Sequence, residues 1–230
     1  MDDKKSSNEN NVTEKKDKDT EIIQSSNNSN IKEKNKFLRT NYITKIALFS
    51  ALAFILSLIQ FPVPFLPNFL KFNFSDFIFL IATFCLGTVA GSIVVVVKVL
   101  LSLFNSFTGY VGEFADLLCS LAFVLPAGLI YRKYRSFKGG IFACLIATIS
   151  STIVGIVCNW TFLVEIYARI VTWEGLLAAM RPLFKDITQE KFYAIYLTTG
   201  VLPFNLLRCL FASAITILSY KKLSILLKKF

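Results

Sequence analysis

LTTGVLPFNLLRCLFASAITILS, residues 197–219, is the stretch that decides the fold of this chain. It is long enough to cross a bilayer as a helix, since about 20 apolar residues span the hydrocarbon core. Tyr220, Lys221 and Lys222 follow at once, and an aromatic residue followed by basic residues is typical of the end of a membrane span. The stretch therefore predicts a transmembrane helix.

Two polar side chains, Asn205 and Arg208, interrupt this apolar stretch. Helical spacing puts both on one face with Val201 and Ala212, so the amide and the guanidinium are expected to project side by side. An arginine at membrane depth costs about 2.5–3.5 kcal/mol on insertion scales and should face a protein interior or a wet cavity. Asn205 could serve only as a hydrogen-bonding contact between helices. The arginine favours a ligand site.

Composition places the chain among multi-span proteins of the lipid bilayer. Its 230 residues are 54% hydrophobic, with 23 Phe, and 17% charged, which is far from the balance of a soluble domain. The net charge of +10 comes from lysines in the N-terminal tail, in one short loop and at the C-terminus. Membrane topology explains these clusters better than nucleic-acid binding does. We therefore expect no nucleic-acid partner.

The residue types that carry most enzyme chemistry are missing from the sequence or lack the spacing that chemistry requires. There is no His, which removes the commonest metal ligand and general base. No phosphate-binding glycine loop occurs. The five cysteines lie inside apolar runs without metal or disulfide spacing, which indicates small core residues. We expect no catalytic residues and no metal site.

The chain divides into a polar tail and a membrane domain. Residues 1–41 are rich in Asn, Lys, Ser, Asp and Glu, a composition that cannot bury a core, so a disordered cytoplasmic tail is predicted. Because these polar residues precede any apolar segment, no cleaved signal peptide is expected. Residues 42–230 are predicted to form the membrane domain.

Charge and parity predict six spans with both termini in the cytoplasm. Basic residues precede the first span, residues 43–60, and the loop 131–138 carries four basic residues and no acid. Both sides are therefore expected to be cytoplasmic, and an even number of spans must separate them. Residues 74–107 must supply two spans, which turn near residues 87–91; a GxxxG contact between helices is the competing account of those glycines. The fold class is thus an all-α integral membrane protein.

The segment FPVPFLPNFLKFNFSD, residues 61–76, should not be a regular helix, because prolines recur through it. An apolar, non-helical segment at the membrane edge must be covered by protein or lie over a cavity. It could form a lid over a ligand or an interfacial loop held by its Phe rings.

Several further features complete the pattern. The fifth span, residues 139–164, runs into NWTFLVEIY, residues 159–167, a second polar and aromatic cluster, and residues 168–196 have the mixed charge of an external loop. Ala47 and Ala51 form a small-x-x-x-small pair that allows another helix to approach closely, or that only packs internally. Glu113 and Asp116 open the fourth span, where the helix dipole favours acids.

From about residue 44 to 228 the chain resembles the riboflavin-binding S component of energy-coupling factor (ECF) transporters. The segments that carry the resemblance are FPVPFLPNFLKFNFSD, LGTVAG at 86–91, GEFADLL at 112–118, FVLPAGLIYRK at 123–133, residues 159–167, GVLPFNLLRCL at 200–210 and YKKLS at 220–224. The resemblance implies six membrane helices that bind riboflavin from outside. It also implies partnership with a transmembrane T subunit and two ATPases.

The resemblance assigns the family's flavin contacts to Asn159, Asn205 and Arg208, and its contact with the T subunit to Ala47 and Ala51. Three positions depart from the family's usual residues: Arg208 stands where lysine is usual, Glu165 where proline is usual, and Asp116 where asparagine is usual. Apolar walls suit a flavin ring and polar groups suit its ribityl chain; candidate walls are Phe61, Phe65, Phe69, Trp160 and Tyr167. The complete set of candidate ligand-binding residues is Phe65, Leu70, Asn159, Trp160, Glu165, Tyr167, Asn205 and Arg208.

The expected function is that of a high-affinity riboflavin-binding subunit of a vitamin uptake transporter in the cell membrane. Riboflavin is then the transported ligand, no cofactor is needed, and the chain is not an enzyme. One alternative is the same architecture serving another vitamin or a flavin analogue. A different class of function is a membrane enzyme that uses Glu113, Asp116 or Glu165 with a metal, although no two of these acids lie at metal-ligand spacing near a His.

Overall fold

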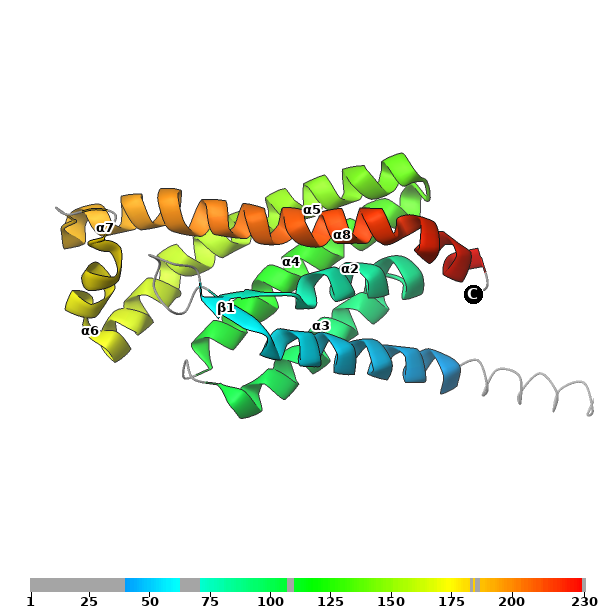
Figure 1. Cartoon of the computed structure of the whole chain (residues 1–230), viewed down its shortest axis with the longest axis horizontal. Coiled ribbons are helices and arrows are strands. Elements are labelled where there is room, and N and C mark those ends of the chain that lie inside the picture. The colour runs from blue at the N-terminus through cyan, green and yellow to red at the C-terminus, as the bar shows by residue number, and fades with distance from the viewer. Residues whose placement is uncertain (1–39, 63–70, 107–109, 183, 185–186, 229–230) are drawn as a thin grey trace, which may run out of the picture. The chain divides into compact units, whose positions relative to one another are not determined.

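The computed structural model of the chain describes residues 40–62, 71–106, 110–182, 184 and 187–228 (Figure 1). The first helix is Thr40–Leu58. It is followed by β1 (Gln60–Pro62), β2 (Lys71–Asn73), α2 (Ser75–Leu86), α3 (Thr88–Ser102), η1 (Leu103–Asn105), α4 (Val111–Lys133), α5 (Phe137–Cys158), η2 (Asn159–Leu163), α6 (Val164–Met180), α7 (Gln189–Ile195), η3 (Tyr196–Val201) and α8 (Leu202–Lys228).

Length and hydropathy single out the helices that can cross a membrane. Within the described ranges, five helical stretches qualify: Thr40–Leu58, Thr88–Asn105, Val111–Lys133, Phe137–Met180 and Gln189–Ser219. The sixth apolar helix, α2, has 12 residues, too few to span about 30 Å of hydrocarbon at 1.5 Å per residue. The predicted all-α fold of six membrane helices is confirmed, and α2 is the short member of the predicted pair within residues 74–107.

Gly87 and Gly91 have different structural roles where α2 meets α3. Gly87 ends α2 and begins α3 with φ +99°, a backbone conformation that L side chains rarely adopt. Gly91 lies one turn into α3, where an added Cβ would collide with the side chain of Thr83 on α2. The predicted turn near residues 87–91 is therefore made by Gly87, while Gly91 allows the two helices to pack closely.

The proline-rich segment forms a two-stranded antiparallel ribbon in its described part. Phe61 of β1 pairs with Phe72 of β2, so the prediction of a non-helical segment is confirmed for these residues. The rings of Phe72 and Phe74 lie 5.5 and 5.7 Å from that of Phe211 on α8. These contacts attach the base of the ribbon to α8. Residues 63–70, with the candidates Phe65, Phe69 and Leu70, lie outside the described residues.

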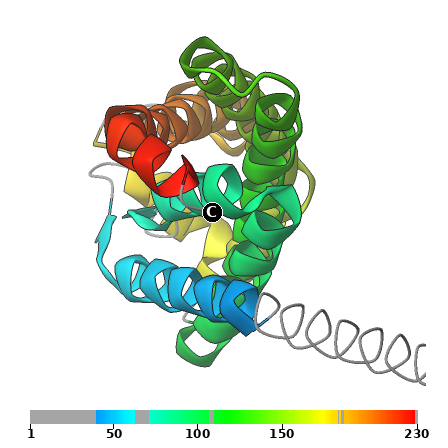
Figure 2. The ribbon, with the colours of Figure 1, turned by 90° about the vertical axis from the view of Figure 1, so that its right-hand side faces the viewer.

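Residues 46–230 form one compact unit. In it α4 packs along α5, α5 packs along α8, and α2 contacts α3, α4 and α8; Figure 2 shows α2 between α4 and α8. The buried face of α5 consists of small residues from Gly139 to Gly155, which lets neighbouring helices approach closely. Four of the five cysteines are buried and one is half-buried, in agreement with their predicted packing role.

Residues 168–196 are largely helical rather than the predicted loop, so that prediction is wrong. The helix that begins as α5 continues through α6 to Met180, with a break at Thr172 (φ +70°), and α7 begins at Gln189. Charged residues of both signs alternate with apolar ones in this stretch, so its amphipathic helical pattern was not recognised. Leu176, Met180 and Phe192 are buried in one apolar cluster, while the charged residues that the structure describes in this stretch are exposed. This is the arrangement that stabilises a surface helix.

Candidate functional site

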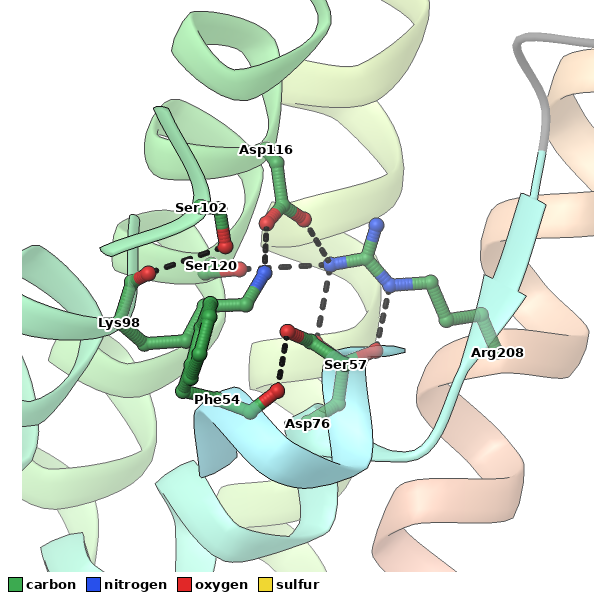
Figure 3. A network of polar contacts seen from close by, with 8 residues as sticks. All are labelled: Phe54, Ser57, Asp76, Lys98, Ser102, Asp116, Ser120 and Arg208. Carbon is green, nitrogen blue, oxygen red and sulfur yellow. Dashed lines mark hydrogen bonds and ion pairs between the residues drawn. The ribbon is translucent and has the colours of Figure 1, made fainter. Parts of the chain in front are cut away.

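Two acids and two bases meet in the interior of the helical unit (Figure 3). Asp76 comes from the first turn of α2, Lys98 from α3, Asp116 from α4 and Arg208 from α8. Their side chains are 3, 4, 19 and 9% exposed, respectively. We call these four residues the charge network.

The charge network is a chain of alternating signs. Arg208 donates from Nε and Nη2 to the two carboxylate oxygens of Asp76, at 2.5 and 2.9 Å. Its Nη2 also donates to Asp116 Oδ1 at 3.2 Å and to Ser120 Oγ at 3.3 Å. Lys98 Nζ donates to Asp116 Oδ2 at 2.7 Å. Each buried charge thus has an opposite charge within hydrogen-bonding distance, which is what makes burial of ionised groups tolerable.

The charge network was not predicted from the sequence, although its four members are recognisable there as charged residues in or next to apolar segments. Asp76 and Lys98 were absent from the candidate site, and the helix dipole alone does not account for Asp116, whose carboxylate contacts Lys98 and Arg208. One sequence feature could have indicated the network: acids and bases inside apolar segments tend to pair with one another. That signal identifies the members but not their partners.

A second polar group gathers around Gly155 on α5. Asn159 donates from Nδ2 to the Gly155 carbonyl at 2.8 Å, and its Oδ1 accepts a bond from Tyr196 Oη at 2.8 Å. A Cβ on Gly155 would lie 2.8 Å from Asn205 Nδ2, so the Asn205 amide packs directly against this glycine. We call Asn159, Tyr196 and Asn205 the amide cluster. It brings together the two asparagines that the sequence analysis singled out.

The amide cluster joins two irregular helical turns. The π-helical segment η2 begins at Asn159 and the π-helical segment η3 begins at Tyr196. The Tyr196–Asn159 hydrogen bond therefore links the first residues of both segments. Single π-turns are rare in proteins and occur frequently at functional sites. Their pairing here marks this part of the molecule as a candidate site.

Asn205 and Arg208 are buried, as predicted, but they reach different neighbours. Asn205 donates to Val201 O in its own helix at 2.9 Å and packs on Gly155 of α5, whereas Arg208 reaches α2 and α4. Residues three apart on a helix point about 60° apart, which is enough to aim their side chains at different helices. Val201 and Ala212, which were predicted to share this face, are buried as well; within the face, the amide and the guanidinium contact different helices.

The remaining candidates differ in exposure. Tyr167 is buried at 4% relative exposure, while Trp160 is 65% exposed. Glu165 is exposed and pairs with Arg169 at 3.1 Å. Trp160 and Glu165 thus lie on the outward side of the helical segment that carries Asn159. Ala47 and Ala51 are both exposed on the first helix. Among the described residues, no group of three or more Cys, Asp or Glu is arranged to hold a metal ion.

A protein-family model described as "ECF transporter, substrate-specific component" matches residues 41–220. The chain belongs to this family. The matched residues include every member of the charge network and of the amide cluster. Membership, together with the apolar helices, makes the chain a multi-pass membrane protein.

Individual relatives of this ECF substrate-specific component agree with the family match. "Riboflavin transporter RibU" of Staphylococcus aureus (strain TCH60) is 36% identical, over 80% of this chain and 90% of that protein. "Riboflavin transporter FmnP" of Bacillus subtilis (strain 168) is 28% identical, over 81% of this chain and 93% of that protein. A solved structure described as "Structure and mechanism of the S component of a bacterial ECF transporter" superposes with TM-score 0.65 at 35% identity, over 83% of this chain and 99% of the other.

Proposed function

We propose that this ECF substrate-specific component binds riboflavin with high affinity from outside the cell membrane and serves in its uptake. The observation that carries the proposal is the similarity to proteins named riboflavin transporters, which extends over 80% of this chain for the Staphylococcus aureus relative. The family match covers residues 41–220, which include both asparagines and Arg208.

The polar groups of the site suit the edge of a flavin ring. A side-chain amide carries two donor hydrogens and an acceptor oxygen, and Asn159 and Asn205 each use one donor within the protein. Arg208 uses Nε and Nη2 in the charge network, while Nη1 makes no hydrogen bond to any described residue. Donor and acceptor capacity therefore remains for the carbonyls and ring nitrogens of a bound flavin.

We assign the inner contacts to Asn159, Asn205, Arg208 and Tyr167, which are buried. The outer contacts are assigned to Trp160 and Glu165, which are exposed. Phe65 and Leu70 remain candidate contacts from the sequence, and both lie outside the described residues. Apolar and aromatic walls with a few fixed polar groups are the usual composition of such a site. This assignment makes the chain a binding protein rather than an enzyme.

Uptake in this proposal requires a transmembrane T subunit and two ATPases. Ala47 and Ala51 are proposed to contact the T subunit, because both are exposed one helical turn apart on the first helix and small residues permit close helix contact. We place both termini in the cytoplasm, in keeping with the basic clusters. Of the tail predicted over residues 1–41, Thr40 and Asn41 belong to the first helix, and residues 1–39 lie outside the described residues; we propose that residues 1–39 do not contribute to ligand binding, in keeping with their polar composition.

The test is ligand identification on purified protein. Protein produced in flavin-containing medium and purified in mild detergent should be yellow, and the released compound should have the mass of riboflavin. Ligand-free protein should quench riboflavin fluorescence in a saturable titration, with thiamine and biotin as non-competing controls. Release of a different vitamin, or failure of ligand-free folded protein to bind riboflavin, would refute the proposal.

A further inference from the structure

Arg208 is held by one carboxylate along a single edge of its guanidinium. Nε and Nη2 donate to the two oxygens of Asp76, so the planar fork of the arginine matches the planar carboxylate at two points. Both side chains are buried, at 9 and 3% exposure. A two-point contact between planar groups fixes orientation as well as position.

No other described neighbour fixes the guanidinium in this way. Asp116 gives its Oδ2 to Lys98 at 2.7 Å, and only its Oδ1 reaches Arg208, at 3.2 Å. Ser120 Oγ lies at 3.3 Å. Both contacts fall on Nη2, a nitrogen that Asp76 already engages. Asp76 is therefore the group that sets the plane of the guanidinium.

Because Asp76 occupies the Nε–Nη2 edge of the guanidinium, Nη1 is the nitrogen that remains for a ligand. Nη1 lies on the opposite side of the guanidinium from the Nε–Nη2 edge, and Figure 3 shows it pointing away from Asp76. None of the hydrogen bonds from Arg208 to the described residues involves Nη1. An arginine fixed in this way presents donors in one direction, at no further ordering cost when a ligand binds.

Asp76 is also well placed to remain fixed. It lies in the first turn of α2, where the helix dipole favours an acid. Two residues earlier, Phe74 contacts Phe211, which is one turn beyond Arg208 on α8. The ion pair and the aromatic contact thus join the same two elements at neighbouring points. They hold the start of α2 against α8.

We propose that Asp76 is a positioning residue for ligand binding, which acts by orienting Arg208 so that Nη1 faces the bound ligand. The inference rests on the proposed function, because Arg208 is taken there as a ligand contact. Asp76 does not touch the ligand in this arrangement. Its whole effect on affinity passes through Arg208.

This dependence can be tested with a double-mutant cycle on riboflavin affinity. The dissociation constant of riboflavin would be measured by fluorescence quenching for wild-type, Asp76→Asn, Arg208→Gln and the double variant, with melting of each ligand-free protein recorded in parallel. Asp76→Asn should raise the dissociation constant about ten-fold or more in the wild-type background, since a charge-assisted two-point contact is lost. In the Arg208→Gln background the same change should alter it less than about two-fold, because residues that act through one another are not additive.

Asp76→Glu provides a second variant that keeps the charge if Asp76→Asn does not yield folded protein. Its longer arm displaces the carboxylate, so affinity should again fall, and again only when Arg208 is present. A merely structural Asp76 would lower the melting temperature and leave the dissociation constant of the folded fraction unchanged, which would overturn the inference. Equal losses of affinity in both backgrounds would overturn it too. Failure of the wild-type protein to bind riboflavin would instead refute the proposed function.

Discussion

Lys98 and Asp116 offer a quantitative test of the charge network. Lys98→Met removes the ammonium group and leaves the half-buried Asp116 carboxylate with a single, longer ion-pair contact, to Arg208. At the 2.7 Å separation of Nζ and Oδ2, the Coulomb attraction is about 6 kcal/mol for an effective dielectric constant of about 20. Desolvation of both groups offsets much of this attraction, so the pair as a whole contributes little net stability.

Removing one member of the Lys98–Asp116 pair has a different effect on stability from removing both. Loss of Asp116 removes the carboxylate that Lys98 contacts, and loss of Lys98 leaves Asp116 to share Arg208 with Asp76. Breaking a buried ion pair in this way costs about 3–5 kcal/mol. At about 2–4 °C per kcal/mol for a chain of this size, Lys98→Met or Asp116→Asn should lower the melting temperature by about 6–20 °C. The double variant Lys98→Met/Asp116→Asn removes both charges, so it should melt within about 4 °C of the wild-type protein.

Melting of ligand-free protein in one detergent, followed by thiol labelling or circular dichroism, measures these differences. Lys138→Met is the matched control, because it removes a lysine that is exposed at the start of α5 and should change stability by less than about 0.5 kcal/mol. If the double variant showed the sum of the two single losses, Lys98 and Asp116 would not be an interacting pair. The account of the network would then be wrong.

Three further predictions concern the ligand site and the partner. Asn205→Ala should raise the riboflavin dissociation constant about five- to hundred-fold, because it removes a buried hydrogen bond worth about 1–3 kcal/mol. Arg208→Lys should weaken binding less than Arg208→Ala does. Fluorescence titration, with melting of the ligand-free variants, separates a loss of affinity from a loss of stability alone. Gly155→Ala should displace the Asn205 amide, since its Cβ would lie 2.8 Å from Nδ2, and should weaken binding in the same titration; unchanged affinity would count against the amide cluster. Ala47→Trp or Ala51→Trp should block riboflavin uptake by cells while the isolated subunit binds normally, because bulk there prevents close helix approach; normal uptake by both variants would exclude this interface.

Most of the membrane helices could be predicted from the sequence, because hydrophobic length is a local property. The apolar runs predicted where most spans lie, and the need for positive φ makes Gly87 the turn between α2 and α3. The prolines of residues 61–76 argued against a helix there; residues 61–62 and 71–73 belong to a ribbon, whereas Ser75 and Asp76 already begin α2. Local reasoning failed at residues 168–196, where buried Leu176 and Phe192 are dispersed among charges.

The pairing of the charges follows from how the helices pack, not from the local sequence. Asp76 and Arg208 are 132 residues apart, and nothing in the local pattern around either says that α2 lies against α8. Ion pairs in an apolar interior depend on distances of a few ångströms between groups on different helices, and those distances are set by close packing at small residues such as Gly155 and Gly91. Hydropathy reports that a charge lies within a span, whereas the direction in which its side chain leaves the helix, and the neighbour it meets there, follow from the packing of the whole unit.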